Sequence, residues 1–234
     1  MRHPECPAIT FVMATVLSVA TQKGGTGKSS TAINVACALE SAGYRMRVVD
    51  TDPQATFTKW HKKRKQHGLN GFEVMNVPKG LLEEEIEELR RNKSIDMVII
   101  DCPGNIEDIT ATAVRLSDAV LSPLRPSAID IAHSVDTARF IREMRKAYPD
   151  IRFMLFVNAA MPRWNISRDT AETTREILAS LEKTVVLQAQ IPMAVAVAEF
   201  FGTGQSIFEY APRSSAATAY KKLTKEIIEC LAKD

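Results

Sequence analysis

The sequence predicts an α/β protein with a mostly parallel, twisted sheet that is flanked by helices on both faces. β-Branched apolar runs alternate with helix-like segments, which is the pattern of strands joined by right-handed crossovers. Two of the runs, Met97–Ile100 and Phe153–Val157, are apolar throughout, as expected of strands covered on both faces. A glycine-rich loop also stands between the first run and the first helix.

Each element follows from its local pattern. Runs with strand composition are Val16–Ala20, Arg47–Val49, Phe72–Val77, Met97–Ile100, Ala119–Leu121, Phe153–Val157 and Val185–Gln190. Segments with helix composition are Ser29–Ala42, Thr56–His67, Leu81–Asn92, Ile106–Leu116, Ser127–Ala147, Thr170–Leu181 and Ala216–Ala232. No internal repeat or Gly/Ser linker interrupts them, so we expect one domain over residues 13–234, preceded by a flexible extension at residues 1–12.

Composition is ordinary for a globular protein, with 45% hydrophobic and 25% charged residues among 234. The formal net charge of +2 is compatible with a local nucleic-acid-binding patch but is too small to indicate one. The four cysteines are far apart and form no CxxC pair, which disfavours a disulfide framework or a zinc site and indicates a reducing cytosol.

The apolar segment Ile9–Ala20 resembles a short signal peptide. It runs directly into the glycine loop, and cleavage nearby would destroy that loop. We therefore interpret its second half as a buried first strand. No stretch is long and apolar enough to span a bilayer.

The loop at residues 20–31, "ATQKGGTGKSST", matches a phosphate-binding loop except at one position. The usual pattern is glycine, four residues, then Gly-Lys-Ser/Thr, and here Gln22 replaces the first glycine. The strand–turn–helix context still supports the assignment, because glycine backbone N–H groups and a helix N-terminus bind phosphate. Lys28 would reach the β- and γ-phosphates of a nucleotide and Ser29 would ligate Mg²⁺.

Two further strands end in carboxylates. Asp50 and Asp52 follow one apolar strand, and Asp101 ends another, just before Gly104. Such side chains can hold Mg²⁺ through water or orient an attacking water. Alone, the first pair is better explained as a turn and helix cap before Thr56, and a buried strand ending in aspartate is common. Because these carboxylates occur together with a glycine loop earlier in the sequence, the metal-site interpretation is favoured.

These motifs together resemble the deviant phosphate-loop ATPases of the ParA/MinD class. The matching stretches are "KGGTGKSS", "VVDTDPQ" and "VIIDCPG", followed by "SDAVLSPLRPSAIDIA" and "GQSIFEYAPRSSAATAYKKLTKEI". The resemblance covers the chain from about Val16 to its end and is strongest to the small plasmid-partition ParA proteins (ParF-like). It implies a P-loop NTPase fold, ATP and Mg²⁺ as cofactors, and ATP hydrolysis to ADP and phosphate.

The resemblance also implies roles for single residues. Lys23 would reach across an ATP-sandwiched homodimer to the partner's nucleotide, Ser30 would contact the α-phosphate, and Asn158 would read adenine. Asp52 and Asp101 would lie in the two switch regions. The implied nucleotide-binding set is Lys23, Gly24, Gly25, Thr26, Gly27, Lys28, Ser29, Ser30 and Asn158. The implied catalytic set is Lys23, Lys28, Asp52 and Asp101, and the implied metal-binding set is Ser29, Asp52 and Asp101.

The implied function is plasmid segregation by a cytoplasmic, nucleoid-associated ATPase that binds DNA non-specifically and is reset by a small ParB-type, centromere-binding activator, without a membrane partner. Arg213, Lys221 and Lys222 are the implied DNA contacts, with an ordinary solvated surface as the alternative. Other cargoes remain open: a chemoreceptor array, a carboxysome, a conjugative complex or the division site. A metabolic P-loop ATPase and a filament-forming protein are further alternatives.

One basic run, "KWHKKRK" at residues 59–65, stands on a predicted helix. A nucleic-acid-binding face is one interpretation of it. We favour a solvated helix face with Phe57 and Trp60 packed inward.

Overall fold

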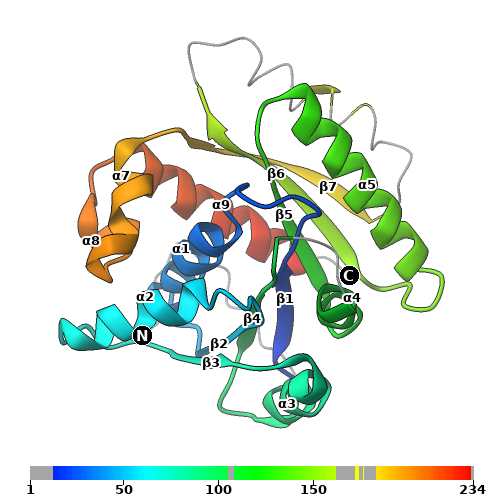
Figure 1. Cartoon of the computed structure of the whole chain (residues 1–234), viewed down its shortest axis with the longest axis horizontal. Coiled ribbons are helices and arrows are strands. Elements are labelled where there is room, and N and C mark those ends of the chain that lie inside the picture. Colours follow the sequence, from blue (N-terminus) through cyan, green and yellow to red (C-terminus); the bar gives the residue numbers. More distant parts are fainter. Residues whose placement is uncertain (1–12, 105–107, 162–171, 174–175, 177–182, 233–234) are drawn as a thin grey trace.

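A seven-stranded sheet forms the centre of the computed structural model, which describes residues 13–104, 108–161, 172–173, 176 and 183–232 (Figure 1). The strands are β1 (Thr15–Val19), β2 (Met46–Asp50), β3 (Glu73–Asn76), β4 (Met97–Asp101), β5 (Ala119–Leu124), β6 (Arg152–Ala160) and β7 (Thr184–Pro192). Their order is β3-β2-β4-β1-β5-β6-β7, and each pairing between described strands is parallel. The predicted α/β class and the seven predicted strands are confirmed.

Helices connect the strands. They are α1 (Lys28–Ser41), α2 (Thr56–Gln66), α3 (Lys79–Arg91), α4 (Asp108–Arg115), α5 (Ala128–Met144) and α9 (Ser215–Leu231), with the short elements α7 (Val195–Glu199), η1 (Phe200–Thr203) and α8 (Ile207–Tyr210). The first six match predicted helices to within a few residues. The short elements were not predicted, and most of the predicted helix Thr170–Leu181 lies outside the described residues.

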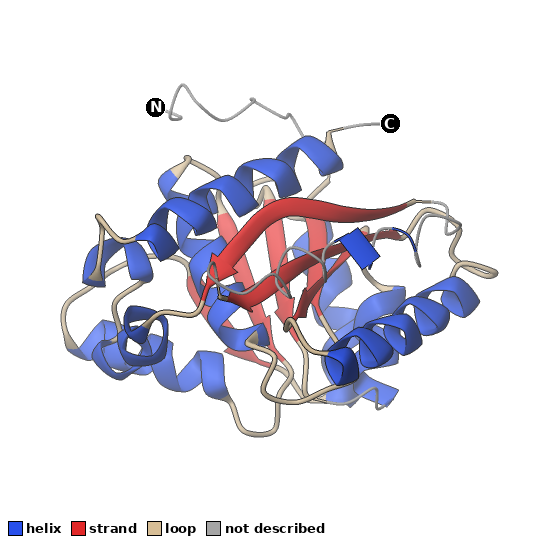
Figure 2. Ribbon diagram, turned by 90° about the horizontal axis from the view of Figure 1, so that it is seen from above, coloured by secondary structure: helices blue, strands red, loops and turns tan. Residues whose placement is uncertain are grey.

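Helices cover both faces of the sheet (Figure 2). Successive strand residues point to opposite faces, so Ile99 packs in one buried cluster while Val98 and Ile100 pack in another. The first cluster lies under α1, α2 and α9, and the second under α3, α4 and α5. Burial on both faces explains why these strands are apolar throughout.

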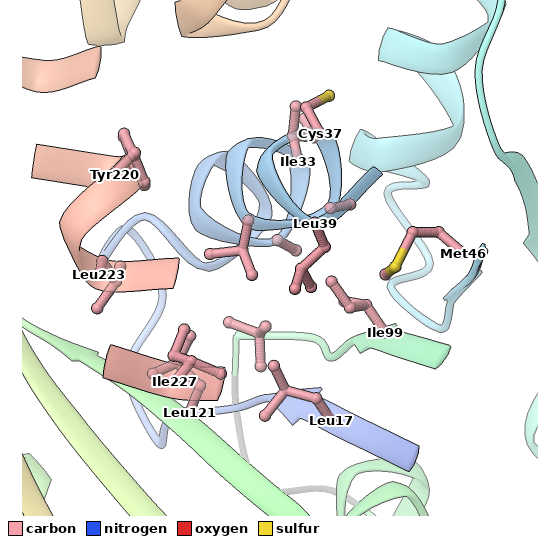
Figure 3. Packing of buried hydrophobic residues seen from close by; sticks show 14 of the residues in the cluster. Leu17, Ile33, Cys37, Leu39, Met46, Ile99, Leu121, Tyr220, Leu223 and Ile227 are labelled. Carbon is pink, nitrogen blue, oxygen red and sulfur yellow. The ribbon is translucent and has the colours of Figure 1, made fainter. Parts of the chain in front are cut away.

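The larger cluster packs β1 and α1 together with α9 (Figure 3). Leu17 of β1 and Ile33 of α1 belong to it, as do Tyr220, Leu223 and Ile227 of α9. The apolar stripe of the last helix therefore docks on the core. No helix in the described part of the chain has the length and hydropathy to cross a membrane.

The strand order places three informative strand ends side by side. β4 lies between β1 and β2, and Asp101 pairs in register with Val19 of β1 and with Asp50 of β2. The carboxyl ends of parallel strands share one edge of a sheet, where ligands of such folds bind. The glycine loop after β1 and the predicted carboxylates therefore meet at this edge.

Candidate functional site

The glycine loop adopts a conformation that needs its glycines. Gly25 has φ 73° and Gly27 has φ 92°, a left-handed region that glycine enters without strain. Gly27 is the N-cap of α1, where no side chain caps the helix and no acidic residue stands in the first turn. The first N–H groups of α1 and its positive dipole end are thus left for an anion.

Asn158 braces the loop from the end of β6. Its side-chain amide donates a hydrogen bond of 2.7 Å to the carbonyl oxygen of Thr26. A Cβ added at Gly27 would lie 2.3 Å from the same amide nitrogen, so only glycine allows this contact. Asn158 is thus a support of the loop in this structure, and its contact with adenine stays a prediction.

Lys28 lies inside the loop rather than in solvent. Its side chain is buried, and its ammonium donates a hydrogen bond of 3.1 Å to the carbonyl oxygen of Lys23. Burial lowers the pKa of Lys28, while the neighbouring Asp101 opposes that shift. A buried cation held by one carbonyl is well placed to bind an incoming phosphate.

Asp101 is a fully buried carboxylate without a partner. Neither of its oxygens accepts a hydrogen bond from a described residue. Burial raises its pKa to about 8, although the nearby Ser29 hydroxyl and the Lys28 ammonium act in the opposite direction. A buried carboxylate that lacks donors is costly, and a bound cation or its water shell would remove that cost.

Asp50 and Asp52 have different surroundings. Asp50 is fully buried and accepts hydrogen bonds from the N–H and hydroxyl of Thr58 and from the N–H of Asp52. It therefore fixes the start of α2 to the end of β2. Asp52 is partly exposed and accepts one bond from the N–H of Gln54. Its carboxylate is the one that lines the cleft.

Lys23, the extra lysine of the loop, points to another element. Its ammonium lies 3.1 Å from a carboxylate oxygen of Asp130 in the first turn of α5. The preceding N–H, that of Gln22, donates a hydrogen bond of 3.3 Å to the Thr137 hydroxyl of the same helix. The amino-terminal half of the loop is thus held by α5, and Lys23 is not among the residues that line the cleft.

The cleft has a volume of about 610 Å³ and is open to solvent. Its lining includes Gly24, Gly25, Gly27, Lys28, Ser29, Ser30, Asp52 and Gly104. Gly104 approaches the loop so closely that a Cβ there would lie 3.0 Å from the Cα of Gly24. Pro103 and Gly104, which follow β4, therefore close one side of the cleft.

The donor set fits magnesium. The described residues contain no group of three or more His, Cys, Asp or Glu side chains that could hold a metal. Mg²⁺ instead keeps waters and takes few protein ligands when phosphates complete its shell. The unpaired Asp101 beside Ser29 supplies such a partial set.

The structure thus brings most predicted site residues together. Four of them are not part of the cleft lining: Lys23, Thr26, Asp101 and Asn158. Asp101 lies near two residues that do line the cleft, Lys28 and Ser29. Arg213, Lys221 and Lys222 lie elsewhere, at exposed positions before and along α9. The sequence alone does not indicate that Asp130 and Thr137 contact the glycine loop. The spacing Ser127-x-x-Asp130 indicates only a helix cap, and that cap is present; nothing in the sequence places it beside Lys23.

Comparison with known proteins supports this assignment. Residues 17–207 match the family model described as "CobQ/CobB/MinD/ParA nucleotide binding domain". The chain is 26% identical over 239 residues to the chromosome-partitioning ATPase Soj of Thermus thermophilus, covering 91% of this chain and 94% of that protein. It is 29% identical over 217 residues to the maintenance of carboxysome distribution protein A of Halothiobacillus neapolitanus, covering 92% and 97%.

Solved structures show the same fold. The MinD cell division protein of Aquifex aeolicus superposes with a TM-score of 0.74 at 18% identity, covering 92% of this chain and 97% of that one. The septum site-determining protein MinD of Pyrococcus horikoshii, solved in complex with Mg-ADP, superposes with a TM-score of 0.72 at 20% identity, covering 94% and 98%. The chain belongs to the CobQ/CobB/MinD/ParA nucleotide-binding family and, within it, to the ParA/MinD class of ATPases.

Proposed function

We propose that this protein is a Mg²⁺-dependent ATPase that partitions DNA, alternating between an ATP-bound homodimer on DNA and a released form. The observation that carries the proposal is the buried ammonium of Lys28, which lines the cleft, together with the nearby buried carboxylate of Asp101, which has no hydrogen-bond partner among the described residues. Both groups lie in surroundings that a magnesium nucleotide would satisfy.

Within one chain, the loop N–H groups and Lys28 bind the phosphates, while Ser29 and Asp101 hold the metal shell. Asp52, which lines the cleft, orients the attacking water. Mg²⁺ held there would offset the negative charge that develops on the phosphates during transfer. These groups act mainly by positioning the reactants and by stabilising charge, as is usual in enzymatic phosphoryl transfer.

Lys23 completes the site of a second copy. In its own chain it pairs with Asp130 and does not line the cleft. A cation supplied in trans stabilises transition-state charge strongly in related phosphoryl-transfer reactions. Dimerisation would then exchange the Asp130 contact for the partner's phosphates, so that hydrolysis depends on assembly.

A mixing experiment tests this arrangement. Lys23→Gln and Asp52→Ala should each hydrolyse ATP slowly as pure proteins, for different reasons. In a mixed dimer, the Lys23→Gln subunit keeps its own Asp52 and receives Lys23 from the Asp52→Ala subunit. An equimolar mixture should therefore recover roughly a quarter of the wild-type rate, because half the dimers have one complete site.

Activity that stays at the level of the pure variants would show that Lys23 acts within its own chain or that no dimer forms. Sedimentation with ATP and with ADP separates those two cases. If Lys23→Gln and Lys28→Ala both keep wild-type ATPase activity and DNA retention, the proposed mechanism is wrong.

The cargo is the second part of the proposal. We infer non-specific DNA binding through Arg213, Lys221 and Lys222, and resetting by a small ParB-type activator that binds a centromere-like site. The similarity to Soj supports a partition role, and the similarity to a carboxysome-distribution protein supports another cargo. An ATPase assay with and without duplex DNA and the product of the neighbouring gene distinguishes them: a DNA-binding activator indicates partition.

A further inference from the structure

Helix α2 has one buried face and one strongly basic face. Its buried residues are Phe57, Trp60, His61 and Arg64, which confirms that the aromatic residues pack inward. Lys59, Lys62 and Lys65 are exposed on the opposite side; we call these three residues the α2 lysine face. The helix contains no acidic residue, so its charge is entirely of one sign.

The α2 lysine face has no counter-charge within the part of the chain that is described. Its three ammonium groups form no ion pair or hydrogen bond there, whereas cations on other helices do. Arg91 pairs with Glu87 on α3, Arg139 pairs with Asp136 on α5, and Lys222 pairs with Glu226 on α9. Exposed cations on the other helices are thus partly neutralised by their own helix, and those of α2 are not.

Helix stability does not account for this pattern. Basic residues stabilise the last turn of a helix through its dipole, which gives Lys65 a local role, but Lys59 and Lys62 lie before that turn. Lys63 has a different partner, because its ammonium lies 5.7 Å from the ring centre of Phe201. Two of the three lysines therefore have no structural role in the described residues.

The helix that carries this face is fixed at both ends. At its start, Asp50 binds the N–H and hydroxyl of Thr58. At its other end, the Arg64 guanidinium forms two hydrogen bonds of 2.7 and 2.9 Å with the Glu209 carboxylate. The indole N–H of Trp60 donates to the carbonyl oxygen of Gln205 between them. The lysines therefore project from a rigid support, which lowers the cost of ordering them on a ligand.

We propose that the α2 lysine face binds the phosphate backbone of duplex DNA, as a surface separate from the residues on α9. The inference rests on the proposed ATP-dependent DNA binding and names a further surface that performs it. A row of unpaired lysines offers charge without base readout, and this suits a polyanion bound regardless of sequence. An anionic membrane fits less well, because the aromatic residues of α2 face the core and leave no apolar side to insert.

The test uses the full chain with ATP and a fluorescent duplex of mixed sequence, over a range of salt concentrations. Lys59→Gln, Lys62→Gln and Lys65→Gln are combined in one variant. Affinity at low salt should fall about tenfold or more, and the slope of log affinity against log salt should decrease by about 3 for each protomer that contacts DNA. Basal ATPase activity should stay at the wild-type value, since no lysine of this face lines the cleft.

A matched control removes the same charge from the other side of the sheet. Arg139→Gln, Arg142→Gln and Lys146→Gln change three exposed cations on and just after α5, which covers the opposite face of the sheet (Figure 1). This variant should keep the wild-type salt slope. A charge-preserving variant that combines Lys59→Arg, Lys62→Arg and Lys65→Arg should keep DNA binding.

Each other result overturns the inference in a recognisable way. If wild-type protein binds DNA with ATP and the α2 variant binds equally well, the α2 lysine face is not a contact. An equal loss in the α5 control would assign the effect to net charge. Loss of binding to phosphatidylserine vesicles, with DNA binding intact, would assign the surface to a membrane. Wild-type protein that fails to bind DNA with ATP would refute the DNA step of the proposed function itself.

Discussion

Asp50 and Asp101 end neighbouring parallel strands at the same register, yet they have opposite surroundings. Both carboxylates are fully buried. Asp50 accepts three hydrogen bonds that tie β2 to α2, whereas Asp101 accepts none from a described residue. The Asp50 carboxylate thus has hydrogen-bond donors within its own chain, whereas the Asp101 carboxylate has none among the described residues.

The difference separates a carboxylate with a structural role, Asp50, from Asp101, which we propose to hold the metal shell. Hydrogen bonding to the charged form favours it, and burial without donors disfavours it. Burial raises the pKa of both groups. At Asp50 the donors from Thr58 and Asp52 oppose the shift; at Asp101 the Ser29 hydroxyl and the Lys28 ammonium oppose it, and the pKa still rises to about 8. A strand-ending aspartate is thus a poor indicator of function until its donors are counted.

The largest expected effect is on catalysis at the unsatisfied carboxylate. Asp101→Asn should lower Mg²⁺-dependent ATPase activity about 100-fold or more, because a neutral amide holds the metal shell poorly. The same variant should be as stable as wild type or more stable, since it no longer buries a carboxylate without donors. Steady-state hydrolysis and urea unfolding measure the two effects.

Asp50→Asn is the matched change one strand away. Its amide oxygen can still accept hydrogen bonds, so the folded variant should retain measurable hydrolysis. Wild-type ATPase activity in Asp101→Asn would contradict the proposed role of Asp101 in holding the metal shell.

The next effect is on stability at the satisfied carboxylate. Asp50→Ala should lower the free energy of unfolding by about 2 to 4 kcal/mol, because three donors lose a charged acceptor in the interior. Asp52→Ala serves as the control and should change it by less than about 0.5 kcal/mol, since its one bond to Gln54 is exposed. Equal stability of Asp50→Ala and wild type would contradict the structural role.

The smallest effect, at no more than about 1.4 kcal/mol for each pH unit, is the gradual dependence of stability on pH without nucleotide. The folded-state pKa of Asp101 is raised to about 8 from an ordinary value of 3.8, so between these values the folded chain keeps a proton that the unfolded chain has lost. The free energy of unfolding should therefore fall as pH rises through this window and level off above it. Asp101→Asn should flatten the slope, as measured by urea unfolding at several pH values; an unchanged slope would assign it to other groups.

Much of the fold follows from the sequence because each strand and long helix has a strong local pattern. Continuous apolar runs such as Phe153–Val157 mark strands buried on both faces. The phosphate loop was predictable for the same reason, since Gly27, Lys28 and Ser29 stand between a strand and a helix. The local sequence pattern was sufficient to predict those elements that are formed by contacts between residues close in sequence.

The rest depends on contacts between residues distant in sequence. The strand order was not predicted, and the short elements α7, η1 and α8 have too few residues to show a period. The contact of Asn158 with the loop and the pairing of Lys23 with Asp130 join positions more than a hundred residues apart. Asp50 and Asp101 have the same local signature, and only their hydrogen-bond partners distinguish them.

The position of β1 has a consequence for how the protein is made. Among the described strands, β1 is the first to leave the ribosome, yet its two neighbours in the sheet are β4 and β5. One edge of β1 therefore has no partner until β4 has been synthesised up to Asp101, and the other has none until β5 has been synthesised up to Leu124. Such late pairing exposes a growing chain to misassociation. The nucleotide loop can acquire its shape only after that moment, so a truncated nascent chain would carry the motif without the site.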